Sequence, residues 1–375
     1  MKKIISFIIT IIIFSGTFIF AQPQVSSKSA IVIEEKSGAI LFAKDENAKM
    51  PMASTTKIMT ALTVLKYEKN LNKLFKIPIE ATKIEGSSMY LKEGEQLSIL
   101  ELLNGLLITS GNDAAKALAI AVSGNQEKFV KKMNDYAKDI NLKNTIFKNP
   151  SGLPAGQHFT TAFELALITR EAFKFEEFRK IVSSKKVKVS LNGIKNARYL
   201  NNHNKLLSLY IGCDGVKTGW TKEAGRCLVS SATRDGVRLI AVTLNAPNDW
   251  QDHKRMLDYS FTRVQKVEIL KAMQENFSVN VVGGTEKTIL LTNALPLSIT
   301  KIDNDDSYIR RIELPEFVYA PIKENQVIGK LVIIKNGFEV SKSDLVSKKD
   351  IEFAPKEKYN LKFKRYLRII VNSLK

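Results

Sequence analysis

The sequence predicts an α/β (α+β) fold in which an antiparallel sheet flanked by helices is followed by a small β-rich domain and a C-terminal amphipathic helix. Three observations support this. Helical periodicity alternates with strand-like runs over the first two thirds of the chain, and a strand meander occupies 214–244. Beyond residue 267 the runs become short and are separated by glycine, proline and asparagine. The chain has 375 residues, 44% of them hydrophobic, which is enough for more than one domain.

The first 21 residues are predicted to be a signal peptide. Met1-Lys2-Lys3 is a charged start, residues 4–20 carry no charge, and Ala21 is a suitable cleavage point. The rival interpretation is an uncleaved anchor, because the apolar run is nearly long enough to span a bilayer. In both cases we expect the main body of the protein to leave the cytoplasm.

The first domain is predicted to extend over residues 28–265. It begins with a hairpin, because apolar runs flank the turn signal Glu35-Lys36-Ser37-Gly38. Helices are expected where apolar residues recur at helical spacing, as Ile58, Leu62 and Leu65 do. The predicted elements are strands at 30–33 and 39–43, a helix at 54–66, two helices within 97–121 broken at 109–112, a helix at 129–140, a loop at 149–156, a helix at 160–172, strands at 216–221, 227–232 and 237–244, and a closing helix at 254–264.

A second, β-rich domain is predicted at 267–353, with strands at 277–282, 288–291, 312–319 and 327–335. The last segment, 359–375, has a helical period that separates apolar from cationic residues. Its longest apolar run has three residues, Ile369 to Val371, so the segment is too short to span a bilayer. We expect it to lie in the membrane interface with its cations on anionic headgroups, although a terminal helix packed on its own domain would show the same pattern. Its apolar face would hold Tyr359, Phe363, Tyr366, Leu367, Ile370 and Leu374, and its polar face Lys364, Arg365, Arg368 and Asn372.

The formal net charge of +19 suits nucleic acid, an anionic membrane surface or an acidic polymer. No nucleic-acid-binding signature accompanies the charge, and the Lys and Arg residues are spread along the chain, so no nucleic-acid partner is expected. The three histidines are isolated and no His/Cys spacing fits a zinc site, so neither a metal nor a cofactor is expected. Cys213 and Cys227 flank one predicted strand. Export permits a disulfide between them, and two free buried thiols are the alternative.

Three short motifs follow one another within the first domain. They are Ser54-Thr55-Thr56-Lys57 at the start of an apolar helix, Ser110-Gly111-Asn112 at a helix break, and Lys217-Thr218-Gly219 on a strand. A serine hydroxyl becomes a good nucleophile only when a base takes its proton, and residues three apart on a helix face the same way. A second Ser-x-x-Lys, from Ser183 to Lys186, leads into a Lys-rich stretch and is interpreted as chance.

These motifs suggest a catalytic role for each member. Ser54 would be the nucleophile and Lys57 its base, with a pKa lowered by burial and by the neighbouring Lys217. Ser110 can relay a proton, and Asn112 can hold a substrate amide.

On the strand motif, Thr218 offers a hydroxyl to a carboxylate, and Gly219 lets a substrate backbone approach closely. Backbone N–H groups of Ser54 and Trp220 would form an oxyanion hole. Taken singly, each motif also has a structural explanation: a helix N-cap for Ser54 or Ser110, a solvated charge for Lys217, or turn chemistry at Gly111-Asn112.

The three motifs in this order resemble those of the serine penicillin-binding proteins and β-lactamases. The stretches 53–60, 109–115, 149–153 and 214–219 are more similar to low-molecular-mass D-alanyl-D-alanine carboxypeptidases. This resemblance implies a β-lactamase/transpeptidase-like fold and removal of the terminal D-Ala from peptidoglycan stem peptides through an acyl-enzyme on Ser54. It further implies inhibition by β-lactams, a part in cell-wall synthesis and cell shape, and a place on the extracytoplasmic face of the bacterial membrane, held peripherally by the C-terminus.

Three alternatives remain at this point: a β-lactamase, a DD-endopeptidase, and a non-catalytic wall-binding protein on the same fold. Class A β-lactamases use an additional Glu, but Glu164 is placed like a partner of the helix dipole. Relatives often carry an Arg shortly before the closing helix for the substrate's terminal carboxylate, and this chain has Asp249 near that place. Either Lys217 and Thr218 hold the carboxylate, or a base such as Lys254 or Arg255 replaces the Arg.

Overall fold

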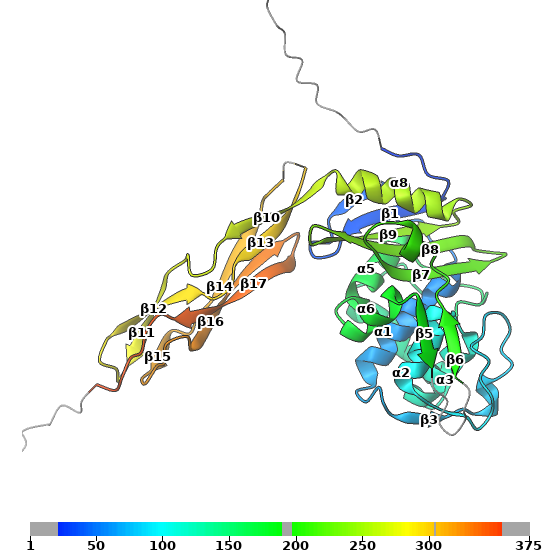
Figure 1. Ribbon diagram of the computed structural model, residues 1–375, viewed down its shortest axis with the longest axis horizontal. Coiled ribbons are helices and arrows are strands. Elements are labelled where there is room, and N and C mark those ends of the chain that lie inside the picture. Colours follow the sequence, from blue (N-terminus) through cyan, green and yellow to red (C-terminus); the bar gives the residue numbers. More distant parts are fainter. Residues whose placement is uncertain (1–21, 190–196, 304, 355–375) are drawn as a thin grey trace, which may run out of the picture.

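The computed structural model describes residues 22–189, 197–303 and 305–354. The predicted signal peptide and the amphipathic segment at 359–375 lie outside these residues. Figure 1 shows a first domain of helices packed on a sheet and a second, elongated domain of strands that extends away from it. This agrees with the predicted α/β domain followed by a β-rich domain.

A five-stranded antiparallel sheet organises the first domain, in the order β2-β1-β9-β8-β7. The predicted hairpin and the predicted meander are both present. They join because β1 pairs along its whole length with β9, with Ser29 opposite Leu244 and Glu34 opposite Leu239. Strand β7 lies at the edge of the sheet, where its outer side faces the helices that carry the other motifs. The strands are β1 (Ser29–Glu34), β2 (Ile40–Lys44), β7 (Cys213–Thr221), β8 (Gly225–Arg234) and β9 (Val237–Leu244).

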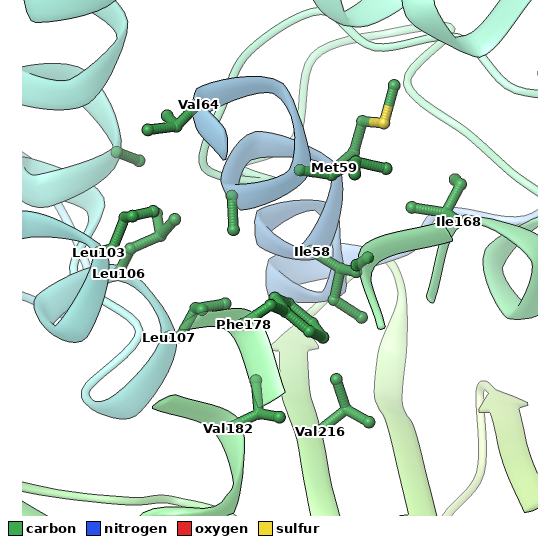
Figure 2. Packing of buried hydrophobic residues seen from close by; sticks show 14 of the residues in the cluster. Ile58, Met59, Val64, Leu103, Leu106, Leu107, Ile168, Phe178, Val182 and Val216 are labelled. Carbon is green, nitrogen blue, oxygen red and sulfur yellow. The ribbon is translucent and has the colours of Figure 1, made fainter. Parts of the chain in front are cut away.

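Both faces of this sheet are covered, because alternate residues of a strand point to opposite sides. Ile31 and Ile33 belong to the larger core beneath α1 (Lys57–Tyr67) and α5 (Ala162–Ala172). Ala30 and Val32 belong to a second core under α8 (Asp249–Phe261). The strands therefore read as continuous apolar runs. Figure 2 shows the larger core, where side chains from several helices and from β7 meet: Ile58, Met59, Val64, Leu103, Leu106, Leu107, Ile168, Phe178, Val182 and Val216.

The helices of the first domain begin and end close to the predicted positions. The break at 109–112 separates α2 from α3, and a capping box of Ser98 and Glu101 starts α2. The sequence did not predict α6, the short helix α7 or four short strands, and the strands are too brief to show a period. The other helices and strands of the first domain, predicted or not, are α2 (Ile99–Ile108), α3 (Asn112–Ser123), α4 (Gln126–Asp139), α6 (Glu176–Ser183), α7 (Leu206–Leu209), β3 (Leu74–Lys76), β4 (Gln96–Ser98), β5 (Lys186–Val189), β6 (Arg198–Asn201) and the 3₁₀ turn η2 (Ile79–Ala81).

Three predicted elements differ from the structure. The helix expected at 54–66 starts as a 3₁₀ turn, η1 (Ala53–Thr56), before α1. The closing helix expected at 254–264 is α8, which begins at Asp249, and Val264 already opens strand β10 (Val264–Leu270). The run 312–319 is two strands, because Pro315 lies between them and has no N–H for a sheet.

The second domain is built on a six-stranded sheet, β14-β16-β17-β12-β11-β15, with β10 and β13 forming a separate pair. Leu331, Ile333 and Leu345 are at the centre of its core. The tip of the β16–β17 hairpin touches the first domain, where the ring of Phe338 lies 3.8 Å from the Arg170 guanidinium carbon. The strands are β11 (Phe277–Val282), β12 (Thr288–Asn293), β13 (Leu297–Ile302), β14 (Ile309–Glu313), β15 (Phe317–Tyr319), β16 (Val327–Lys335) and β17 (Phe338–Ser347).

The cysteines are free thiols. Cys213 lies opposite Ala232 and Cys227 lies opposite Gly219, so the register of the β7–β8 ladder separates them. The disulfide alternative is therefore wrong for this structure. A search of the described ranges for a helix able to cross a membrane found none.

Candidate active site

The three motifs meet at a cleft of about 300 Å³ between the edge strand β7 and the helical side of the first domain. Members of all three line it, together with residues that no motif contained. A cleft of this size suits the end of a small peptide. The lining residues are Ser54, Ser87, Ser110, His203, Thr218, Gly219, Trp220, Arg226, Asp249 and Trp250.

Turn η1 presents Ser54 to the cleft, and two glycines allow it to lie where it does. A Cβ at Gly219 would lie 2.9 Å from the Ser54 backbone nitrogen, so the missing side chain lets β7 pack against η1. Gly152 has a φ of +87°, and a Cβ there would lie 1.9 Å from the Ala53 carbonyl oxygen. The sequence predicted that Gly219 makes room for a substrate backbone. In the structure, the backbone of η1 occupies part of that room.

Lys57 is completely buried, and three oxygens surround its amine. Its Nζ lies 2.9 Å from Ser54 Oγ, 2.7 Å from Asn112 Oδ1 and 2.7 Å from the Ser151 carbonyl oxygen. The pKa of Lys57 is held well below its usual value by burial and then by the charge of Lys217, with Asp113 acting in the opposite direction. The Ser54–Lys57 proximity follows the prediction from helical spacing.

The Ser151 carbonyl was not foreseen as part of the site. The loop at 149–152 presents it, because Asn149 Oδ1 accepts hydrogen bonds from the backbone N–H groups of Ser151 and Gly152. Thr60 Oγ1 donates to the Pro150 carbonyl 2.6 Å away and fastens the loop to α1. The signal available in the sequence was the Asn-Pro-Ser-Gly turn, but a turn motif does not show which carbonyl it presents.

Asn112 begins α3 and is held at both ends of its amide. Its Oδ1 accepts from Lys57, and its Nδ2 donates to the Glu85 carbonyl at 2.6 Å. The next residue, Asp113, accepts hydrogen bonds from the backbone amides of Met89 and Leu91, which fastens the segment around these two residues to the start of α3. The Asn112 side chain therefore serves the protein's own lysine as much as any substrate.

Lys217 is also buried, and its Nζ donates to the Thr218 carbonyl oxygen at 2.8 Å. Burial lowers the pKa of Lys217 to about 7. His203, unmarked by any motif, lines the same cleft, and its pKa is lowered by burial and by Lys217. The site therefore holds two buried amines, those of Lys57 and Lys217, whose charged forms are disfavoured.

The other predicted residues take distinct places. Ser110 has a φ of +60° at the break between α2 and α3, and its side chain is buried at the cleft wall. Trp220 is 67% exposed and forms part of the rim. Glu164 is remote from the cleft and accepts hydrogen bonds from the backbone amides of Lys143 and Asn144, so it fastens a loop. Within the described ranges, no group of His, Cys, Asp and Glu side chains could hold a metal ion.

Asp249 and Arg226 form an ion pair inside the cleft. Arg226 Nη2 donates to Asp249 Oδ1 at 2.9 Å, and the guanidinium lies beside the Trp250 ring. Arg226 enters the cleft because it is opposite Trp220 in the β7–β8 ladder. Lys254 and Arg255, considered as replacement bases, do not line the cleft, and Arg255 donates to the Gln24 carbonyl instead.

Two family models cover most of the chain. The model described as D-alanyl-D-alanine carboxypeptidase matches residues 17–248, and that described as penicillin-binding protein 5, C-terminal domain, matches residues 265–353. The chain belongs to the D-alanyl-D-alanine carboxypeptidase family. Its two matched parts make it similar to the low-molecular-mass penicillin-binding proteins that resemble penicillin-binding protein 5.

Individual relatives agree with this family. D-alanyl-D-alanine carboxypeptidase DacF of Bacillus subtilis is 36% identical over 337 residues, 88% of this chain and 86% of the relative. DacC of Escherichia coli is 32% identical over 348 residues, 88% of this chain and 85% of the relative. The structure of penicillin binding protein 5 from Haemophilus influenzae aligns with a TM-score of 0.64 at 31% identity, over 89% of this chain and 99% of that one.

The protein is thus a serine-type D-alanyl-D-alanine carboxypeptidase, a peptidase that acts on peptidoglycan. Carboxypeptidases of this family work outside the cytoplasm. The expectation from the three motifs is confirmed at the level of family and reaction.

Proposed function

We propose that the carboxypeptidase reaction runs through an ester on Ser54. Ser54 Oγ attacks the carbonyl carbon between the last two D-Ala residues of a stem peptide, and Lys57 takes the hydroxyl proton. The C–N bond breaks as the leaving amine receives a proton, and free D-Ala departs. Water then attacks the ester carbon, the bond to Ser54 Oγ breaks, and the serine recovers its proton.

The observation that carries this proposal is the arrangement of three oxygens around Lys57. A neutral amine has two N–H donors and one lone pair. The carbonyl oxygens of Asn112 and Ser151, both at 2.7 Å, accept the two hydrogens, which leaves the lone pair facing Ser54 Oγ at 2.9 Å. Burial and then the charge of Lys217 lower the pKa of Lys57 and so favour that neutral form, which is the form that can act as a general base.

The other predicted site residues complete the proposed chemistry. Ser110 relays a proton to the leaving amine, Asn112 orients Lys57 and can meet a substrate amide, and Lys217 supplies positive potential. The backbone N–H groups of Ser54 and Trp220 stabilise the oxyanion. A β-lactam, which presents a strained amide to the same serine, would acylate Ser54 and act as an inhibitor.

A carboxypeptidase releases a free D-Ala, whereas a DD-endopeptidase cuts the same bond type in a crosslink. Both use the same serine. The cleft has a volume of about 300 Å³ and is bounded by Trp220, Trp250 and the Arg226–Asp249 pair, which suits a free peptide end better than a branched crosslink. Product analysis on stem peptides and on crosslinked dimers distinguishes the two activities.

The protein is further proposed to associate with the membrane surface through residues 359–375. The observation that supports this is the segregation of aromatic and aliphatic residues from Lys364, Arg365 and Arg368 in the sequence of that segment. The β-rich domain would then separate the cleft from the bilayer, which suits a polymeric substrate lying outside it.

The test of Ser54 is the intact mass of the protein after incubation with penicillin. We expect one penicilloyl adduct on the wild type and none on Ser54→Ala. Ser183→Ala is the matched control, because it removes the serine of the second Ser-x-x-Lys, at the end of α6 and outside the cleft. An adduct that persists in Ser54→Ala contradicts the proposal. Rapid loss of penicillin without an adduct would indicate β-lactamase turnover, and neither adduct nor loss would favour wall binding without catalysis.

A further inference from the structure

A peptide that ends in D-Ala-D-Ala carries a carboxylate one residue beyond the bond that breaks. The site therefore needs a cation near Ser54 to bind that carboxylate. Lys57 is taken up by its three oxygens, and Lys217 donates to the Thr218 carbonyl. Burial and then Lys217 lower the pKa of His203, which disfavours its charged form. Of the residues that line the cleft, Arg226 is the one with a permanent positive charge.

We propose that Arg226 binds the terminal carboxylate of the substrate, and that Asp249 positions its guanidinium for that contact. The side chain of Arg226 is 43% exposed, whereas that of Asp249 is 4% exposed. The carboxylate of the pair is therefore buried, and the guanidinium is open to the cleft. This inference rests on the proposed acyl-enzyme at Ser54.

The geometry leaves the guanidinium free to bind. One of its nitrogens donates to Asp249 Oδ1, and the others have no hydrogen-bond partner among the described residues. A guanidinium holds five N–H donors in a fixed fork that matches a carboxylate. The Trp250 ring lies beside it and restricts its rotation, with 5.7 Å between the guanidinium carbon and the ring centre.

Asp249 is itself fixed from behind. Its Oδ1 accepts from the Trp250 backbone N–H at 2.9 Å, at the start of α8. Without Arg226, this buried carboxylate would face the incoming carboxylate and repel it. Asp249 at the start of α8 therefore positions the guanidinium of Arg226 on β8, and Arg226 binds the substrate carboxylate.

The experiment compares two substrates, an N-acylated Lys-D-Ala-D-Ala peptide and the same peptide with a C-terminal amide. For Arg226→Gln we expect kcat/KM on the free acid to fall by about 10- to 100-fold, the loss typical of a charge-assisted hydrogen bond. We expect little change on the amide, so the preference for the acid disappears. Arg226→Lys keeps the charge but not the fork, and should keep part of the preference.

Arg234→Gln is the matched control. Arg234 is also on β8 and is also paired with an aspartate, Asp258 at 3.1 Å, but it lies outside the cleft. An equal fall on acid and amide in Arg226→Gln, or an unchanged preference for the acid, overturns the proposal. If instead the wild type releases nothing from either peptide, or Ser54→Ala remains active, the proposed function fails rather than the role of Arg226.

Discussion

At the scale of single residues, the proposed chemistry depends on two buried lysines, Lys57 and Lys217. Lys57 has two carbonyl oxygens and one hydroxyl around its amine, and Lys217 is buried on β7. A buried charge next to another of the same sign is doubly disfavoured. The lowered pKa of Lys57 thus depends on a residue 160 positions further along the chain, and the pH dependence of acylation should report that dependence.

We predict that Lys217→Gln shifts the rise of penicillin acylation with pH to higher pH. Lys57 acts as a base only when neutral, and the Lys217 charge lowers its pKa, so removing that charge raises the pKa of Lys57. The second-order rate constant is measured from acidic to mildly alkaline pH. Lys222→Gln, on the exposed turn after β7, is the control. A lower plateau with no change in midpoint would mean that Lys217 acts on the substrate alone.

At the scale of elements, the tip of the β16–β17 hairpin of the second domain packs against the first domain. The Phe338 ring stacks on the Arg170 guanidinium, which in turn donates to the Lys36 carbonyl in the β1–β2 turn. A Cβ at Gly38 would lie 2.9 Å from the Phe338 ring, so the glycine in that turn makes room for the hairpin tip. A buried hydrogen bond from Thr300 Oγ1 to Glu34 Oε1, 3.2 Å long, adds a second contact.

We expect Phe338→Ala to loosen this contact without affecting catalysis. The cation–π interaction contributes about 1 kcal/mol, so its loss would weaken the contact between the domains by that free energy. Hydrogen exchange should become faster at the backbone amides of 35–39, while kcat/KM on a small peptide stays unchanged. Phe317→Ala is the control, because that ring packs on Tyr319 within the second domain. Equal exchange in both variants would show that the hairpin tip does not protect the turn.

For the whole molecule, the β-rich domain extends away from the first domain, as Figure 1 shows. The cleft is assembled entirely from the first domain, since its lining residues lie between Ser54 and Trp250. Binding at a membrane and catalysis at the cleft should therefore be separable.

A chain that ends at Ala354 is predicted to keep its kcat/KM on a small peptide and to lose sedimentation with anionic vesicles. Each cation near such a surface contributes about 1 kcal/mol, so the full chain should also lose binding as salt rises. Neutral vesicles provide the lipid control. In the full chain, glutamine at Lys364, Arg365 and Arg368 should weaken binding in the same direction. Undiminished sedimentation of the shortened chain would contradict the membrane proposal.

The sequence alone indicated the family, its reaction and most of the fold. Ser54 and Lys57 are one helical turn apart, and strand and helix periods follow from local apolar spacing, so both can be read within a short window. Tertiary structure alone decided that β1 pairs with β9, that the Ser151 carbonyl holds Lys57, and that Arg226 faces the cleft with Asp249 behind it. The physical reason is that these contacts join residues far apart in the chain, and the packing of the sheet against its helices, which no local pattern encodes, sets which of them meet.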